Sequence, residues 1–232
     1  MEGFHYVDIF STKGIEYIIV LGFLFILIYF WQRLNLQKPS TAHALDRSAT
    51  AISLVDWFKM ADAYQYHQGH AWAAAGDAST VKVGVDDFVQ KLLGRVDKVK
   101  LPDTGSVVRQ GEPGLAFELD GKTIPVLAPV GGEVIRLNEA VLSDPQKMQD
   151  DPYGAGWLME VRPSNLRRDQ GQLFSGELAK AWLREHVDRI SGLLTSRMGV
   201  VLQDGGAIAP GFARELEPDH WDELTRDFLL TN

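Results

Sequence analysis

The feature that most constrains this chain is an apolar run near its N-terminus, IEYIIVLGFLFILIYFW (residues 15–31). It carries one charged side chain, Glu16, and aromatic residues lie near both of its ends. Extended through QRLNL, it reaches the roughly 20 residues that a helix needs to cross about 30 Å of hydrocarbon, with aromatics at the interfaces. The run therefore predicts a transmembrane helix over residues 15–36, with a buried core helix as the alternative.

Charges on the two sides of this run predict an orientation. Lys13 is the one basic residue between the N-terminus and the run, whereas Arg33, Lys38 and Arg47 follow it. Positive charge favours the cytoplasmic side. The acidic, aromatic leader fits a cleaved signal peptide poorly, because it lacks a basic start and no small-residue cleavage site follows. We therefore expect a single-pass anchor in the cell membrane with a cytoplasmic C-terminal domain.

The segments on either side of the run have no strong periodicity. Residues 1–14 are loosely amphipathic, which is typical of an interfacial segment, although a disordered tail fits equally well. Residues 37–63 begin QKPSTAHALDRSATAIS, a stretch rich in Pro, Ser, Thr and Ala. Such a composition predicts a linker between the helix and a folded body.

Composition limits the function of that body. The chain has 232 residues, of which 45% are hydrophobic, enough to bury a core. Its net charge is −8, and no cluster of Lys and Arg suggests a grip on nucleic acid. There is no Cys, which excludes disulfides, thiol nucleophiles and cysteine-ligated iron–sulfur clusters. We expect neither a nucleic-acid partner nor a small-molecule substrate.

From residue 64 to residue 163 short apolar runs alternate with Gly, Pro and Asp. This spacing is typical of a small antiparallel β sandwich or barrel. Asp86 begins a short helical stretch that ends at Gly94, with Phe88 and two leucines at helical spacing. The strand candidates are residues 81–85, 95–101, 114–119, 123–129, 131–138 and 157–163.

Five motifs in order carry a resemblance across this region. They are HAW (70–72), VGVDDFVQKLLG (83–94), LPDTGSVVRQGE (101–112), APVGGEVIRLNE (128–139) and DPYGAGWL (151–158). Together they resemble the H-protein of the glycine cleavage system, of the biotinyl/lipoyl-carrier type. The resemblance implies a mainly β, lipoyl-domain-like barrel-sandwich hybrid. It also implies a hairpin tip where the family keeps a lipoyl-bearing lysine within Glu-Ser-Val-Lys-Ala.

That tip differs in this chain. Aligning LPDTG and APVGGE with the family without gaps puts Gly121 at the carrier position and Lys122 one residue late. A shift of one residue turns a side chain to the other face of a strand. Asp120 and Gly121 are also the signature of a two-residue type I′ turn. We therefore interpret Lys122 as an unmodified lysine beside a tight turn; the alternative is lipoate attached to Lys122.

Other candidate sites point to structure rather than chemistry. His67 and His70 are three residues apart and fall on opposite faces of a strand, so we expect no metal site. The resemblance gives His70 and Trp72 a structural role. The adjacent carboxylates in QDDP (149–152) have no Ser or His nucleophile system beside them. We therefore assign no catalytic residue.

Residues 164–232 follow the resembling region and are predicted to form an α-rich extension. Helical patterns cover residues 175–199 and 218–230, with a strand and a turn between them in VVLQDGG. The extension either covers the β domain or docks another subunit, with Trp182 or Trp221 as the buried anchor. His220 lies between Asp219 and Asp222, which we interpret as an acidic helix start rather than a metal site.

These features favour a non-catalytic, membrane-anchored scaffold or docking subunit. We expect its partners to be the membrane and the other subunits of a multisubunit complex, with a respiratory or electron-transfer complex as the host. The chain is not expected to be an enzyme, although a site in the C-terminal extension is a third possibility. The main alternative is a lipoyl-type carrier of acyl or aminomethyl groups that uses Lys122.

Overall fold

The structure is a computed structural model. It describes residues 9–35, 54–77, 79–198 and 209–231. The chain divides into two compact units, Met1–Ala49 and Thr50–Asn232. Most of the predicted linker over residues 37–63, the first eight residues of the predicted interfacial segment, and the strand and turn predicted in VVLQDGG lie outside the described residues.

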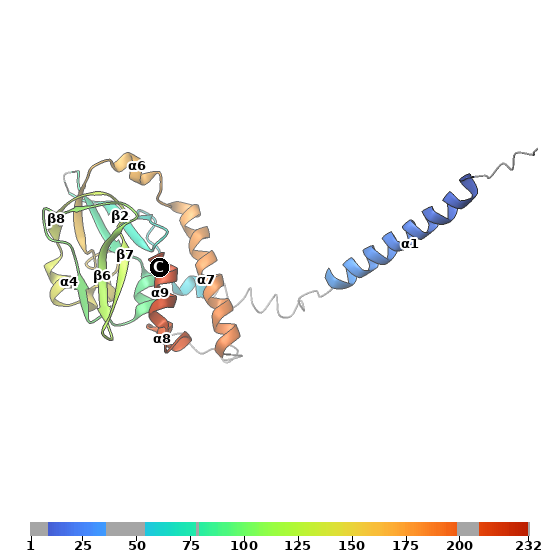
Figure 1. The fold of residues 1–232 in the computed structure, drawn as a ribbon. Helices are drawn as coiled ribbons and strands as arrows, with labels where there is room; N and C mark the ends of the chain where they lie inside the picture. Colours follow the sequence, from blue (N-terminus) through green and yellow to red (C-terminus); the bar gives the residue numbers. More distant parts are fainter. Residues whose placement is uncertain (1–8, 36–53, 78, 199–208, 232) are drawn as a thin grey trace, which may run out of the picture. The chain divides into compact units, whose positions relative to one another are not determined.

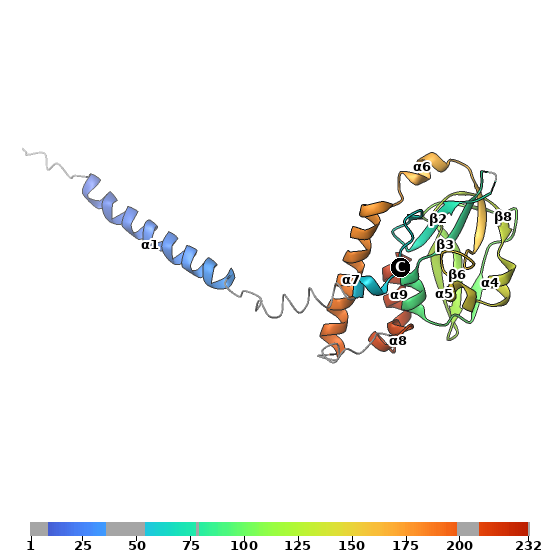
Figure 2. The same ribbon diagram turned by 180° about the vertical axis from the view of Figure 1, so that it is seen from behind.

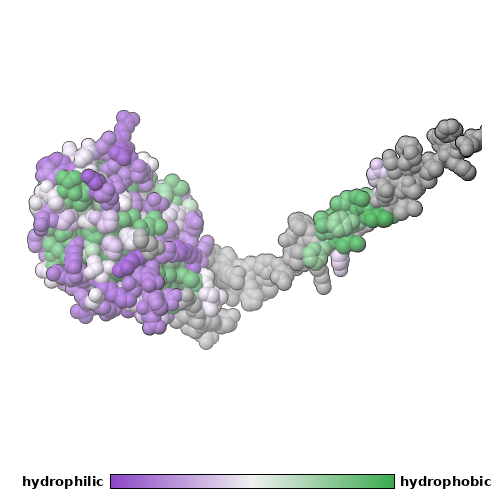
Figure 3. Space-filling view, viewed as in Figure 1, coloured by the Kyte–Doolittle hydropathy of each residue, from purple (hydrophilic) through white to green (hydrophobic). Residues whose placement is uncertain are grey.

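The first unit contains α1 (Ile9–Asn35). Its described side chains run from Tyr17 to Phe30, and the apolar ones are exposed (Figure 3). Within the described ranges, no helix combines the length and hydropathy that a membrane crossing requires.

This finding corrects two predictions. The transmembrane helix predicted over residues 15–36 is overturned, because no helix of the described residues is both long and apolar enough to cross a membrane. The single-pass location in the cell membrane with a cytoplasmic C-terminal domain depended on that helix, so it is overturned as well.

The second unit holds all the strands of the described chain and most of its helices (Figure 1). The strands are β1 (Gln65–Tyr66), β2 (Ala71–Ala75), β3 (Val81–Val85), β4 (Lys98–Lys100), β5 (Val107–Val108), β6 (Pro113–Leu119), β7 (Lys122–Leu127), β8 (Gly132–Leu137) and β9 (Met159–Pro163). The helices are α3 (Asp87–Leu93), α4 (Glu139–Ser143), α5 (Gln146–Asp150), α6 (Leu166–Gln170), α7 (Gly176–Met198), α8 (Phe212–Leu216) and α9 (Trp221–Leu229).

The prediction of a mainly β chain is wrong, since more of the described residues lie in helices than in strands. The strands are short, from two to seven residues, whereas α1 and α7 alone have 27 and 23 residues. The chain is therefore an α and β protein, although every predicted strand segment of the β domain contains an observed strand.

The strands form two antiparallel sheets. One has six strands in the order β1-β2-β3-β9-β8-β5, and the other has three in the order β4-β6-β7. Neighbouring strands within each sheet pair antiparallel, as the short spacing of the apolar runs predicted. The two views in Figures 1 and 2 show α7 and α9 on the same side of these strands. This arrangement brings C-terminal helices to the face of the β6–β7 hairpin.

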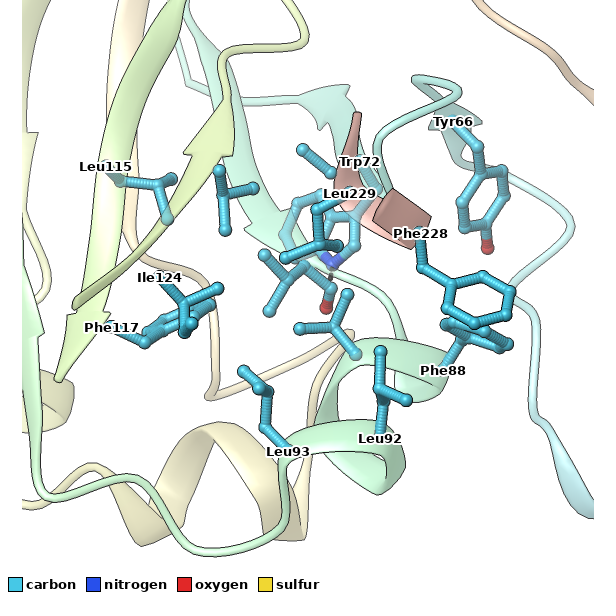
Figure 4. Packing of buried hydrophobic residues seen from close by; sticks show 14 of the residues in the cluster. Tyr66, Trp72, Phe88, Leu92, Leu93, Leu115, Phe117, Ile124, Phe228 and Leu229 are labelled. Carbon is cyan, nitrogen blue, oxygen red and sulfur yellow. Dashed lines mark hydrogen bonds between the residues drawn. The ribbon is translucent and has the colours of Figure 1, made fainter. Parts of the chain in front are cut away.

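The core joins both sheets, α3 and the C-terminal helices. Figure 4 shows Phe117 and Ile124, from β6 and β7, in the same apolar cluster as Phe88 of α3 and Phe228 of α9. Phe117, Ile124 and Phe228 are fully buried. Burying a large apolar side chain contributes about 1.5–3 kcal/mol. The C-terminal helices are therefore part of the fold of this unit.

The helix predicted to begin at Asp86 is confirmed as α3. Asp86 accepts a hydrogen bond from the Val89 backbone N–H and caps the start, and Gly94, with φ of 68°, ends the helix. Close packing explains the glycine just before it. A Cβ at Gly84 would lie 2.3 Å from the ring of Trp72, which is 1% exposed. Three residues of the VGVDDFVQKLLG motif (83–94) are thus explained by structure: Gly84 by packing against Trp72, and Asp86 and Gly94 by the two ends of α3.

The two helices predicted in the C-terminal extension are present as α7 and α9. Most large apolar side chains of α7 are buried, including Trp182, Val187, Ile190 and Leu194, but Leu178 is 61% exposed. Trp221, expected as a buried anchor, is 5% exposed. The side chains of these two helices thus cover the β domain, which is the first of the two predicted roles of the extension.

Candidate functional site

The hairpin tip (residues 119–123) is the candidate site. Leu119 pairs with Lys122 across the two strands, which leaves Asp120 and Gly121 as the loop. Their φ angles are 51° and 71°. Positive φ at both central residues is what a type I′ turn requires, and Gly and Asp tolerate it better than most residues do. The predicted two-residue turn is therefore confirmed.

Gly121 is the second of the two loop residues and is exposed. A Cβ built on Gly121 would meet nothing within 4 Å. Space therefore does not explain a glycine here. The backbone does, because φ of 71° strains any residue that carries a side chain.

Lys122 begins β7 and is held by the C-terminal extension. Its Nζ donates a hydrogen bond to Asp222 Oδ1 and lies 5.2 Å from the centroid of the Trp221 ring. The side chain of Lys122 is 36% exposed, and that of Asp222 is 15% exposed. The hydrogen bond from Lys122 lowers the pKa of Asp222, while burial raises it by less. The Asp222 carboxylate is therefore ionised at neutral pH.

Asp120 and Thr123 of the tip are engaged as well. Arg214 Nε donates to Asp120 Oδ2 at 2.6 Å, and the Asp120 backbone N–H donates to Asp97 Oδ2 at 3.0 Å. Arg226 donates to the carbonyl oxygen of Thr123 at 3.2 Å. Three residues of the tip thus contact charged side chains of α8 and α9.

A second cluster of chemistry-bearing side chains surrounds His70, in the loop before β2. His70 is fully buried, and its Nδ1 lies 2.7 Å from Asp86 Oδ2. Its backbone φ is 64°, unusual for a residue with a side chain. The ring stacks on Phe88, with centroids 4.1 Å apart, and His186 of α7 meets it edge-on at 4.8 Å.

Two histidines of this cluster have hydrogen-bond partners within the fold. His67 Nδ1 accepts from the Gly69 backbone N–H at 3.1 Å, so it is already occupied. Burial lowers the pKa of His67 and of His186, and the neighbouring His70 lowers both further. Among the described residues, no group of three or more His, Cys, Asp or Glu is placed to hold a metal ion.

The remaining sequence candidates lie apart from one another. Asp151 accepts from the backbone N–H groups of Gly154 and Ala155, at 2.9 and 2.7 Å, and so shapes a turn. His220 precedes α9 and is exposed, with no side-chain capping bond.

Sequence reasoning missed the partners of the tip, Asp222, Arg214 and Arg226. The acidic start of α9 was a signal for Asp222, but its spacing also fits the helix dipole. No local pattern connects residue 122 with residue 222. Only the fold brings them together.

Comparison with known proteins assigns residues 64–186 to a known family. The family model described as glycine cleavage H-protein matches residues 64–186. A probable glycine cleavage system H protein of Pyrococcus abyssi is 36% identical over 127 residues, covering 55% of this chain and 94% of the relative. The glycine cleavage system H protein 2 of Aquifex aeolicus is 34% identical over 128 residues, covering 55% and 80%.

A solved structure is also similar to this chain. The crystal structure of a glycine cleavage system H protein from Mycobacterium marinum has 30% sequence identity and a TM-score of 0.47, covering 54% of this chain and 99% of that one. The family match ends within α7 at residue 186, so α8 and α9 lie outside it.

Proposed function

The chain belongs to the glycine cleavage H-protein family, and from this premise we propose that its H-protein-like domain is a non-catalytic scaffold or docking module that carries no lipoyl group. Its partners in this proposal are other protein subunits. The family supplies the fold and the expected position of a carrier lysine. The hairpin tip of this chain supports the departure from the carrier role.

The observation that carries the proposal is the geometry of the tip. A lysine that carries a swinging arm has to project from its turn, and the turn position here is Gly121 at φ of 71°. Lys122 lies in β7, opposite Leu119 in the strand register. Its amine is paired with Asp222 and lies over the Trp221 ring. The one lysine near the carrier position is thus part of an internal contact.

The buried histidine cluster supports a non-catalytic role. His70 and Asp86 form an acid–base pair of the kind that enzymes use, but both side chains are at most 3% exposed. A general base has to come within hydrogen-bond reach of its substrate. Asp86 is also occupied by capping α3. This pair therefore contributes to the fold rather than to a reaction.

A second candidate function is a lipoyl-type carrier that uses Lys122. One observation favours it: the Lys122 side chain is 36% exposed, so a modifying enzyme could reach part of it. In this case lipoate would be the cofactor, and its attachment would break the pair with Asp222.

The mass of the intact chain, purified from its native host, separates the two candidates. The proposed function predicts the unmodified mass. An added lipoyl mass on the wild-type chain that is lost in Lys122→Arg would contradict it and establish the carrier. Lys100→Arg is the matched control, because Lys100 lies on β4 in a partly exposed pair with Glu118. That variant should leave the mass unchanged apart from the substitution.

A second measurement addresses docking. If the chain is a scaffold, native purification under gentle conditions should retain a partner protein at a fixed stoichiometry through size exclusion. A chain that migrates alone at its own mass would contradict the docking role, whatever its lipoylation state.

A further inference from the structure

The hairpin tip is covered by a segment of the same chain. Arg214 of α8 binds Asp120, Asp222 of α9 binds Lys122, and Arg226 of α9 donates to Thr123 O. These contacts reach three of the five residues of the tip. We call α8 and α9 together the tip cap.

An aromatic side chain lies at the centre of these contacts. Trp221 is 5% exposed, with Lys122 Nζ 5.2 Å and Arg214 Cζ 5.4 Å from its ring. A cation within about 6 Å of an indole ring is attracted to it. Lys122 of the tip and Arg214 of the tip cap thus each meet both an opposite charge and the ring. This is the composition of a protein interface with a buried tryptophan anchor and a charged rim.

The tip cap is fixed to the domain away from the tip as well. Phe228 and Leu229 of α9 are fully buried in the core, and the Phe228 ring lies 5.6 Å from that of Phe88. At the other end, the Gly211 backbone N–H donates to Lys91 O at 2.7 Å. A Cβ at Gly94 would lie 2.8 Å from the Gly211 backbone, so the two segments pack too closely for a side chain at residue 94.

We propose that the hairpin tip is an interaction surface whose occupant is the chain's own tip cap. The cap offers the chemistry that the surface fits: a helix that presents an aromatic residue, then a carboxylate, then an arginine one turn later. Another protein of that chemistry would have to displace the cap. The inference goes beyond the proposed function, because it concerns which segment of the chain covers the tip and not which partner the domain binds.

Two observations specific to this chain support the proposal. The tip cap lies outside residues 64–186, the range that the family model matches. The charges are also complementary in both directions: Asp120 of the tip pairs with Arg214 of the tip cap, and Lys122 of the tip pairs with Asp222 of the tip cap. The cap is thus an addition to the family domain that is complementary to this tip.

Competitive acylation of the full-length chain with a limiting amine-reactive acetyl ester tests the proposal. Peptide mass spectrometry then gives a labelling rate for each lysine. Lys122 should react more slowly than Lys98, an exposed lysine of β4. In Asp222→Asn the Lys122 rate should rise about twofold to fivefold, as expected for a partly exposed ion pair.

Asp227→Asn is the matched control, because Asp227 is also on α9 but pairs with Arg189 of α7 instead of the tip. It should leave the Lys122 rate at the wild-type value. Trp221→Ala, which removes the anchor, should raise the rate further than Asp222→Asn while circular dichroism shows the β domain intact.

Two results would overturn the proposal. One is a Lys122 rate equal to that of Lys98 in the wild-type chain. The other is the same Lys122 rate in Asp222→Asn and Asp227→Asn. Failure of the proposed function has a different signature, a lipoyl group on the native chain. The two ideas can therefore fail separately.

Discussion

The hairpin tip and the histidine cluster are both places where acidic and basic side chains pair, and burial separates them. Lys122 and Asp222 remain 36% and 15% exposed, whereas His70 and Asp86 are 0% and 3% exposed. An exposed pair contributes little to stability, while breaking a buried one leaves an uncompensated group in the interior. We therefore expect the histidine cluster to stabilise the fold, and the pair at the tip to limit access to Lys122.

The largest effect is expected when Asp86 is removed. Asp86→Ala leaves buried His70 without its partner and takes away the cap of α3. We expect a loss of about 3–5 kcal/mol in the free energy of unfolding, measured by urea denaturation. Asp222→Asn should cost at most about 1 kcal/mol in the same assay. Equal losses would remove the contrast between the two regions.

A pH series sharpens the contrast. Burial lowers the pKa of His186 and of His67 in the folded chain. As the pH falls below the ordinary value of about 6.5, the unfolded chain takes up protons first. Stability should therefore be complete above that pH and fall as the pH drops towards the folded pKa values. The slope is at most about 1.4 kcal/mol per pH unit for each histidine.

His186→Gln should reduce that loss between pH 7 and pH 5 in thermal or urea unfolding. His220→Gln is the control, because His220 is exposed before α9 and should leave the slope unchanged. A wild-type chain that is equally stable at both pH values, or a His186→Gln slope identical to the wild type, would show that the cluster does not titrate in this way.

Two glycine substitutions should give smaller effects of opposite sign. Gly121→Ala should destabilise the chain by about 1 kcal/mol, because alanine is strained at φ of 71°. Gly192→Ala should stabilise it by about 0.5–1 kcal/mol, because Gly192 lies within α7 with nothing within 4 Å of a built Cβ. Urea unfolding measures both. A stabilising Gly121→Ala would mean that the tip does not need its turn.

Local patterns predicted local structure well. The capping residues Asp86 and Gly94 marked the ends of α3, and Asp120 with Gly121 marked the turn, because each rule involves neighbours in the chain. The register of β6 and β7 then placed Lys122 beside that turn rather than in it.

Non-local features were beyond the sequence. Nothing near Lys122 points to Asp222, one hundred residues later. Nothing near His70 announces the buried partner Asp86, although both lie in motifs that carried the resemblance. Class-level predictions were wrong for another reason. The strand motifs all lie in the β domain, whereas α1 and α7 outside it make helix the larger share of the described residues.

The most direct test of the central claim is a ligase assay on the purified full-length chain. Lipoate, ATP and a lipoate ligase are supplied with this chain and with a glycine cleavage H protein as a positive control in the same tube. Peptide mass spectrometry reads lipoyl-lysine. We predict that the control is modified and that Lys122 stays unmodified. A lipoyl group on Lys122 at the rate of the control would contradict the account.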